Sequence, residues 1–422
     1  MPTMGCRIAD RADKYGRQQR QLQSSISHIK IHIPPSSCIS TRTRHTVHEK
    51  NQHTDCCRRV RIKLKPTMSS PAPEPPHVVE DCRGVLQLIS DGTVRRSADP
   101  AFPVEIPAGD LGVKWKDVTW DPEHGLNVRL YRPRRHLGAA ADDDDARIRI
   151  PVVAYFHGGG FCIGSCRWPN FHAWCLRLAA ELPAVVLSFD YRLAPEHRIP
   201  AAQEDGAAAM SWLRATATAT AGGGDPWLAG AADFTRVFVA GDSAGGNIAH
   251  HVAAAFGKAG LAPAIRIRGA ALLAPAMAGE ARTRGELECP PGAFLTTATC
   301  DKYCRLALPA GATRDHPAMN LTGTEAPALG AVEMAPVLVV AGERDVLRDR
   351  NEEYARRMRE EWGKEVEYVE VAGAEHGFFQ RDPWSEGADE VVRLVQQFVG
   401  EHMDSELDGT PVPVSVTLFS RQ

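Results

Sequence analysis

The sequence predicts an α/β fold with a mostly parallel central sheet that is covered by helices on both faces. Short apolar segments typical of buried strands alternate with segments whose apolar residues recur at helical spacing. In the last of these segments, Val391, Leu394, Val395 and Phe398 stand at positions i, i+3, i+4 and i+7. With 422 residues and 43% hydrophobic content, the chain is long enough to bury a large core.

The predicted elements follow one another in a regular order. Strand-like segments at 84–90, 112–120 and 126–132 precede an Asp-rich segment, 139–146, which we interpret as a solvated loop. Further strands are predicted at 152–156, 185–189, 237–240, 270–273, 337–341 and 366–371. Helices are predicted near 171–181, 202–214, 246–256, 299–308, 349–361 and 388–399. Turns at the carboxyl ends of such parallel strands are where ligand-binding residues gather.

A G-x-S-x-G motif lies between the strand at 237–240 and the helix at 246–256. In this setting the motif predicts a nucleophile elbow, a sharp turn that exposes a serine hydroxyl, here that of Ser243. The amide N–H of Ala244 follows the nucleophile at the positive end of the helix, so it can donate to a developing oxyanion. Asp242, inside the motif, is interpreted as structural.

A run of one histidine and three glycines follows the strand at 152–156. Gly158 and Gly159 lack side chains, which leaves their N–H groups free to face the same oxyanion as Ala244. The strand before each run makes this pairing much more specific than either motif alone.

A serine nucleophile needs a base and an orienting carboxylate. Asp345 follows the strand at 337–341, and His376 follows the strand at 366–371, on the same edge of the predicted sheet. These residues predict a Ser243–His376–Asp345 triad in which His376 moves the proton and Asp345 fixes the ring. Asp349 is a rival carboxylate, but its position predicts an N-cap of the next helix.

Several motifs together resemble plant carboxylesterases of the hormone-sensitive-lipase branch, which also contains the gibberellin receptors. They are H-G-G-G-F, D-Y-R-L-A-P-E-H at 190–197, G-D-S-A-G-G-N-I-A-H at 241–250 and G-E-R-D-V-L-R-D at 342–349. G-A-T-R-D-H at 311–316 is most similar to the carboxylesterase 15-like subgroup. The resemblance extends over residues 68–403 and implies an α/β-hydrolase fold.

The resemblance implies a serine carboxylic-ester hydrolase that acts on small-molecule esters, with strigolactone hormones among the substrates of the subgroup. A hormone receptor of the gibberellin-receptor type is the alternative. In those receptors the triad histidine is replaced, so His376 favours hydrolysis. Acyl or lactone transfer by the same triad is a third interpretation. Neither a metal nor an organic cofactor is expected, and the oligomeric state stays open.

Two stretches are predicted to form a lid over the site: 79–107, before the main β-α alternation, and the insertion at 276–336. The sequence does not identify which of their side chains face inward. Cys162, two residues after the glycine run, is predicted to line the pocket. The odd number of cysteines, without a secretion signal, predicts reduced thiols.

The charge is unevenly distributed. Residues 1–67 carry 14 Lys and Arg against 4 Asp and Glu, whereas the remainder carries 35 against 48. The acidic body argues against a nucleic-acid partner, and no apolar stretch is long enough for a membrane span. Three interpretations of residues 1–67 are open: a mispredicted gene extension, an organelle transit peptide, or a disordered basic arm. Residues 404–422 are expected to be a tail, and the catalytic domain a cytoplasmic, or also nuclear, protein.

Overall fold

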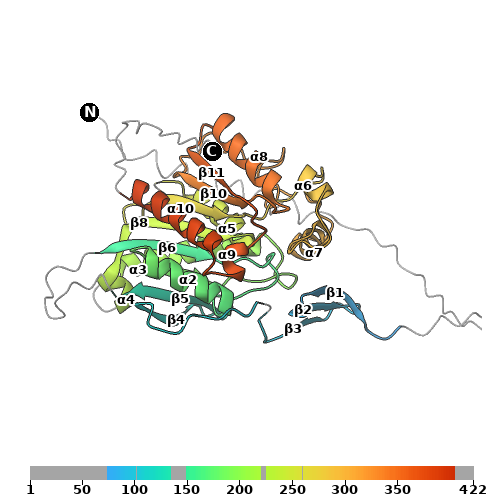
Figure 1. Cartoon of the computed structure of the whole chain (residues 1–422), viewed down its shortest axis with the longest axis horizontal. Coiled ribbons are helices and arrows are strands. Elements are labelled where there is room, and N and C mark those ends of the chain that lie inside the picture. Colours follow the sequence, from blue (N-terminus) through green and yellow to red (C-terminus); the bar gives the residue numbers. More distant parts are fainter. Residues whose placement is uncertain (1–73, 101, 135–148, 220–224, 259, 404–422) are drawn as a thin grey trace, which may run out of the picture. The chain divides into compact units, whose positions relative to one another are not determined.

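The computed structural model describes residues 74–100, 102–134, 149–219, 225–258 and 260–403 (Figure 1). The predictions for the basic extension at 1–67, the Asp-rich loop at 139–146 and the tail at 404–422 lie outside these residues.

The centre of the molecule is an eight-stranded sheet with strand order β11-β10-β9-β8-β6-β7-β5-β4. Its strands are β4 (Val113–Asp121), β5 (Leu126–Pro133), β6 (Ile150–Phe156), β7 (Val185–Phe189), β8 (Ala232–Asp242), β9 (Ile267–Leu273), β10 (Val337–Gly342) and β11 (Val366–Val371). Neighbouring strands from β7 to β11 pair in parallel, while β4 and β5 add an antiparallel edge. The predicted mostly parallel sheet is therefore confirmed.

Helices cover both faces of this sheet (Figure 1). One side holds α3 (Ala201–Thr218), α4 (Pro226–Ala231), α5 (Ala244–Phe256) and α8 (Arg348–Glu360), and the other α2 (Pro169–Glu181), α9 (Phe378–Arg381) and α10 (Glu386–His402). Strand β6 shows how alternation creates the two cores, because Ala154 and Phe156 face the first and Val153 and Tyr155 the second.

The stretch before the main sheet forms a sheet of its own. Its strands β1 (Val78–Cys82), β2 (Leu86–Ile89) and β3 (Val94–Arg96) pair antiparallel in the order β1-β2-β3. Only β2 was predicted, and it does not join the central sheet. Strands β1 and β3 and helices α4, α6 and α9 were missed because each is too short to show a period.

The insertion between β9 and β10 contributes α6 (Arg284–Leu287) and α7 (Thr297–Ala307). Helix α7 is tied to the three-stranded sheet, since Lys302 donates to the carbonyl of Asp81 at 2.6 Å and Arg305 pairs with Glu80 at 2.6 Å. We call these two parts, residues 78–96 and 276–336, the lid segments.

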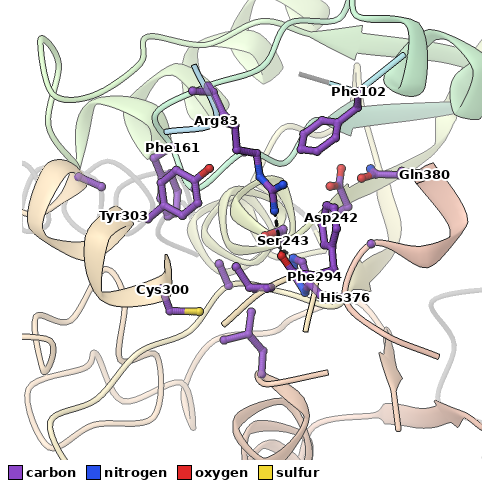
Figure 2. Close-up of a pocket in the computed structure, with 18 of the residues that line it drawn as sticks. Arg83, Phe102, Phe161, Asp242, Ser243, Phe294, Cys300, Tyr303, His376 and Gln380 are labelled. Atoms are coloured by element: carbon purple, nitrogen blue, oxygen red, sulfur yellow. Dashed lines mark hydrogen bonds between the residues drawn. The ribbon is translucent and has the colours of Figure 1, made fainter. Parts of the chain in front are cut away.

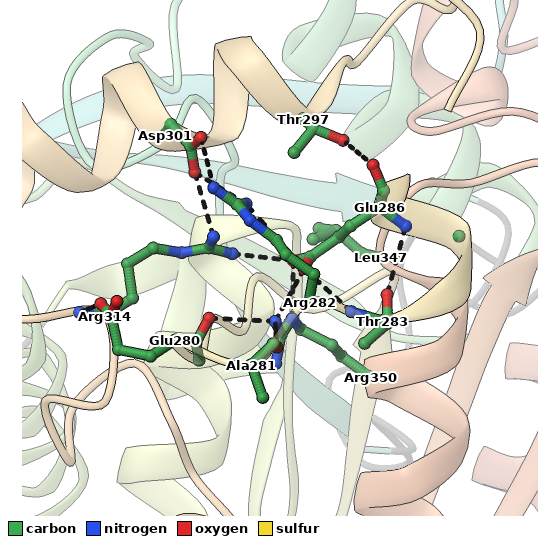
Figure 3. A network of polar contacts seen from close by, with 12 residues as sticks. Glu280, Ala281, Arg282, Thr283, Glu286, Thr297, Asp301, Arg314, Leu347 and Arg350 are labelled. Carbon is green, nitrogen blue, oxygen red and sulfur yellow. Dashed lines mark hydrogen bonds and ion pairs between the residues drawn. The ribbon is translucent and has the colours of Figure 1, made fainter. Parts of the chain in front are cut away.

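A buried carboxylate fastens the insertion to α8. Glu286, whose side chain is 1% exposed, accepts from Arg314 and Arg350, both at 2.8 Å (Figure 3). Asp301 of α7 joins the cluster by pairing with Arg282 at 2.7 Å and Arg314 at 3.2 Å. These guanidiniums hold the pKa of Glu286 below its usual value, so burial of its charge is compensated.

Candidate active site

Ser243 stands at the sharp turn between β8 and α5 with a strained backbone, at φ 50° and ψ −118°. Glycines on both sides make the turn possible. A Cβ on Gly241 would lie 2.3 Å from the carbonyl oxygen of Gly245, and one on Gly245 would lie 1.9 Å from that of Phe156. The strand and the helix can therefore approach only without side chains there, which exposes the Ser243 hydroxyl at the sheet's edge.

The three residues of the predicted triad lie together in the structure. His376 Nε2 is 3.0 Å from Ser243 Oγ, and His376 Nδ1 is 2.7 Å from Asp345 Oδ2. Both Asp345 and His376 are buried. Because the carboxylate of Asp345 accepts at Nδ1, the proton of a neutral ring lies on Nδ1 and leaves Nε2 to accept from the serine hydroxyl.

Asp345 is held by the loop that follows β10. Its Oδ1 accepts from the backbone N–H of Leu347 at 2.9 Å, so one carboxylate oxygen is fixed and the other faces His376. Asp349 does not reach the site: its carboxylate accepts from the N–H of Gly285 at 2.6 Å and pairs with Arg348. The N-cap prediction for Asp349 was wrong, because α8 begins at Arg348 with Leu347 at its N-cap.

The glycine run after β6 comes close to Ser243. Gly159 has φ +117°, and a Cβ there would lie 1.9 Å from the carbonyl oxygen of Ile163, so only glycine fits. Gly160 has φ +62° and lies against the ring of Tyr303 on α7. Both residues line the cavity that contains Ser243 and His376.

Gly158 has different surroundings from the two glycines after it. It lies against the side chain of Asp242, where an added Cβ would come within 2.2 Å of Oδ2, and it does not line the cavity. Ala244 begins α5 directly after Ser243, where the first N–H groups of a helix have no partner within the helix. This arrangement favours Gly159, Gly160 and Ala244 as oxyanion donors, so Gly160 replaces Gly158 of the sequence prediction in our assignment.

A cavity that is open to solvent leads to Ser243 (Figure 2). Its walls are mostly apolar and come from both lid segments, from the loop before β4 and from the main domain. Residues that the sequence did not identify include Arg83, Phe102, Phe294, Tyr303 and Gln380. No sequence pattern shows that their side chains face the cavity. Most of them lie on turns or on the short helix α9, and tertiary packing sets which way the helix α7, with Tyr303, is turned.

The prediction for Cys162 was wrong. Its side chain is fully buried beneath the lid, whereas its neighbours Phe161 and Ile163 line the cavity. The thiols at the cavity wall belong to Cys300 and Cys304 of α7. The seven cysteines of the described residues are unpaired.

Asp242 connects the serine turn to the histidine loop. It accepts from the Tyr155 hydroxyl at 2.7 Å, and that hydroxyl is 3.1 Å from the amide nitrogen of Gln380 on α9, just beyond His376. Burial raises the pKa of Asp242 to about 6, against the lowering effects of Tyr155 and Gln380. The structural role expected for Asp242 is consistent with these contacts.

Replacing Asp242 with Asn should remove a pH-dependent loss of stability. The pKa of Asp242 is about 6 in the folded protein, above the value near 3.8 in the unfolded chain. The unfolded chain therefore loses this proton at lower pH than the folded protein, and the free energy of unfolding falls as the pH rises from about 4 to 6. In urea unfolding experiments, the free energy of unfolding of the wild type should fall by roughly 1–3 kcal/mol more between pH 4.5 and pH 8 than that of Asp242→Asn. An exposed replacement, Asp99→Asn, is the control. Parallel profiles for the wild type and Asp242→Asn would show that the carboxyl ionises normally.

Comparison with known proteins supports this description of the fold. A family model described as alpha/beta hydrolase fold matches residues 153–380, more than half of the chain. The chain therefore belongs to the α/β-hydrolase family.

Relatives narrow this assignment. The chain is 38% identical to a probable carboxylesterase 6 from Arabidopsis thaliana over 289 residues, which cover 65% of this chain and 78% of that protein. It is 34% identical to a gibberellin receptor from Oryza sativa subsp. japonica over 306 residues, which cover 69% of this chain and 83% of that receptor. An esterase structure from Pyrobaculum calidifontis matches with a TM-score of 0.56 at 29% identity, and the match covers 69% of this chain and 86% of the esterase. Within the family, the chain is a carboxylic ester hydrolase of the plant carboxylesterase and gibberellin-receptor branch.

No described helix is long and apolar enough to cross a membrane. No group of three or more His, Cys, Asp or Glu side chains in the described part of the chain is arranged to hold a metal ion.

Proposed function

We propose that this chain hydrolyses esters of small molecules through an acyl-enzyme on Ser243. The observation that carries the proposal is the hydrogen-bonded series Ser243–His376–Asp345 at an apolar cavity. Ser243 Oγ attacks the ester carbonyl while its proton passes to His376 Nε2. The resulting imidazolium, stabilised by Asp345, then protonates the leaving alcohol. Water then attacks the acyl carbonyl while His376 Nε2 takes its proton, and the bond to Ser243 Oγ breaks as His376 returns that proton to Oγ and the acid leaves.

The oxyanion that forms during each step would be bound by backbone N–H groups. Gly159 and Gly160 line the cavity that contains Ser243, and Ala244 follows Ser243 at the start of α5. A single donor of this kind is worth about 10²–10³-fold in rate, because it is already oriented before charge develops.

The cavity favours a substrate with a sizeable apolar part, since aromatic and aliphatic side chains from both lid segments surround it. Strigolactone-type esters are one candidate class, based on the resemblance to the carboxylesterase 15-like subgroup. A pure receptor function is less well supported, because His376 is present and lies within hydrogen-bond distance of Ser243.

A labelling and turnover experiment tests the proposal. We expect the wild type to release p-nitrophenol from p-nitrophenyl acetate and to react with a fluorophosphonate probe at Ser243, identified by peptide mass. The reason is that only an activated serine attacks such a phosphonate. A panel of acyl chain lengths and a strigolactone analogue would then locate the preferred substrate.

The controls separate the competing functions. Binding of the strigolactone analogue with neither turnover nor labelling would favour the receptor interpretation and contradict ours. Products formed with and without an added alcohol distinguish hydrolysis from transfer: free acid in both cases supports hydrolysis, whereas a new ester as the main product supports transfer.

A further inference from the structure

Arg83 occupies a turn position that usually selects against its side chain. It follows β1 in a tight turn closed by the N–H of Val85 donating to the carbonyl of Cys82 at 3.1 Å. Arg83 has φ +56° and Gly84 φ +70°. Turns with two positive φ values favour Asn, Asp and Gly, so an arginine here carries a conformational cost. Such strained positions often mark functional sites.

The side chain of Arg83 is directed from this turn into the cavity, toward the end where Ser243 and His376 lie (Figure 2). Its guanidinium lies 5.1 Å from the ring centre of Phe102 and 4.4 Å from that of Phe294. One nitrogen donates to the carbonyl oxygen of Phe294 at 2.8 Å, and the group also interacts with the Tyr303 hydroxyl. Aromatic rings therefore fix the guanidinium in place while leaving other N–H groups for a ligand.

The charge of Arg83 is not neutralised within the site. No carboxylate among the described residues lies within ion-pair distance of it. The other arginine of the cavity, Arg381, is 4.3 Å from the Phe294 ring centre and already pairs with Glu375 at 3.5 Å. The one carboxyl in the wall, Asp242, is bonded to Tyr155. A mostly apolar cavity thus presents, on the solvent-exposed side chain of Arg83, one positive charge without an anionic partner among the described residues.

We propose that Arg83 determines specificity by binding a carboxylate that the ester substrate carries at a distance from its scissile carbonyl. This inference rests on the proposed esterase function and adds the substrate class, anionic esters. A guanidinium suits the task because its planar donors match the two oxygens of a carboxylate. Its place on a turn of the lid segments, outside the hydrogen-bonded series Ser243–His376–Asp345, means that it would recognise the substrate without moving a proton in bond cleavage.

The competing explanation is a structural clamp, in which Arg83 only joins β1–β2 to the loop at Phe294. Arg83→Asn separates the two roles, since asparagine is favoured at the turn's left-handed position and removes the charge. Arg83→Lys keeps the charge but loses the planar fork. Arg95→Gln removes a positive charge from exposed β3 of the same small sheet and is the matched control.

The experiment compares half-esters with neutral esters of matched length. The substrates are the mono-p-nitrophenyl esters of succinic, glutaric and adipic acid, each beside the p-nitrophenyl ester of the straight-chain acid with the same number of carbons. We expect Arg83→Asn to lower the ratio of anionic to neutral kcat/KM by about 10–100-fold for the best-fitting length. Arg83→Lys should be intermediate and Arg95→Gln equal to wild type. Raising NaCl from 50 to 500 mM should reduce the wild-type preference.

Each outcome has one meaning. An unchanged ratio of anionic to neutral kcat/KM in Arg83→Asn overturns the inference, whether both values stay at the wild-type level or fall equally. An equal fall on both kinds of ester is the result that a structural clamp predicts. Wild-type hydrolysis of the neutral esters with no discrimination by charge would also overturn it, while leaving the esterase function intact. Absence of turnover on every ester would instead contradict the proposed function.

Discussion

Ser243→Ala should lower kcat for p-nitrophenyl acetate by about 10⁴–10⁶-fold, the range seen when a nucleophile is removed from a hydrogen-bonded triad. The methyl group of alanine cannot form the acyl-enzyme, and His376 then has no hydroxyl to deprotonate. The oxyanion donors and the cavity remain, so a small residual rate above the uncatalysed reaction should persist. Initial rates with active-site titration of the wild type provide the measurement.

The control for this variant is Ser211→Ala, which removes an exposed hydroxyl on α3 that bonds only the carbonyl of Ala207. It should retain wild-type rates. Equal rates for the wild type and Ser243→Ala would exclude Ser243 as the nucleophile, and with it the role of His376 as its base.

Asp345→Asn should lower kcat by about 10⁴-fold with little change in folding. The N–H of Leu347 requires an acceptor, so the asparagine oxygen would face Leu347 and its NH₂ group would face His376 Nδ1. That NH₂ donates to Nδ1 and moves the ring proton to Nε2, which can then no longer accept from Ser243. The wrong tautomer, rather than lost structure, would therefore cause the loss.

Asp349→Asn is the matched control because it makes the same change in charge four residues further along the chain, at a carboxylate facing Gly285 and Arg348. We expect less than about a 10-fold change in kcat, since this carboxylate does not touch His376. A larger loss in Asp349→Asn than in Asp345→Asn, with both variants folded by circular dichroism, would reverse the assignment of the two residues.

The sheet and the polar site were predictable because their signals are local. The parallel strands from β6 to β10 contain short apolar runs, and runs buried on both faces have few alternatives, whereas β11 at the edge of the sheet alternates apolar with charged residues. Ser243, Asp345 and His376 each follow a predicted strand, so the direction of the strands alone places them at one edge. The Gly-rich turns added specificity, since a side chain at Gly241 or Gly245 would collide with backbone atoms.

The cavity wall could not be predicted in this way. Arg83 and Phe294 lie far apart in the sequence, and their contact depends on how a three-stranded sheet and an insertion pack together. The position of Cys162 gave a misleading indication, because chain proximity to the glycine run does not fix the direction of a side chain. The choice of Gly160 in place of Gly158 as an oxyanion donor has a similar reason: Gly158 lies against the side chain of Asp242, and no spacing rule reveals that contact.

The order of strands also has a consequence for how activity is acquired. Ser243 follows β8, Asp345 follows β10 and His376 follows β11, and these strands meet only through successive parallel pairings, each of which closes a long loop. Pairings of this kind form slowly compared with helices and hairpins. Partly folded chains in which α5 and the serine turn are already formed would still have no esterase activity. After dilution from denaturant, the recovery of activity therefore reports the docking of the last strand and not the earlier collapse of the core.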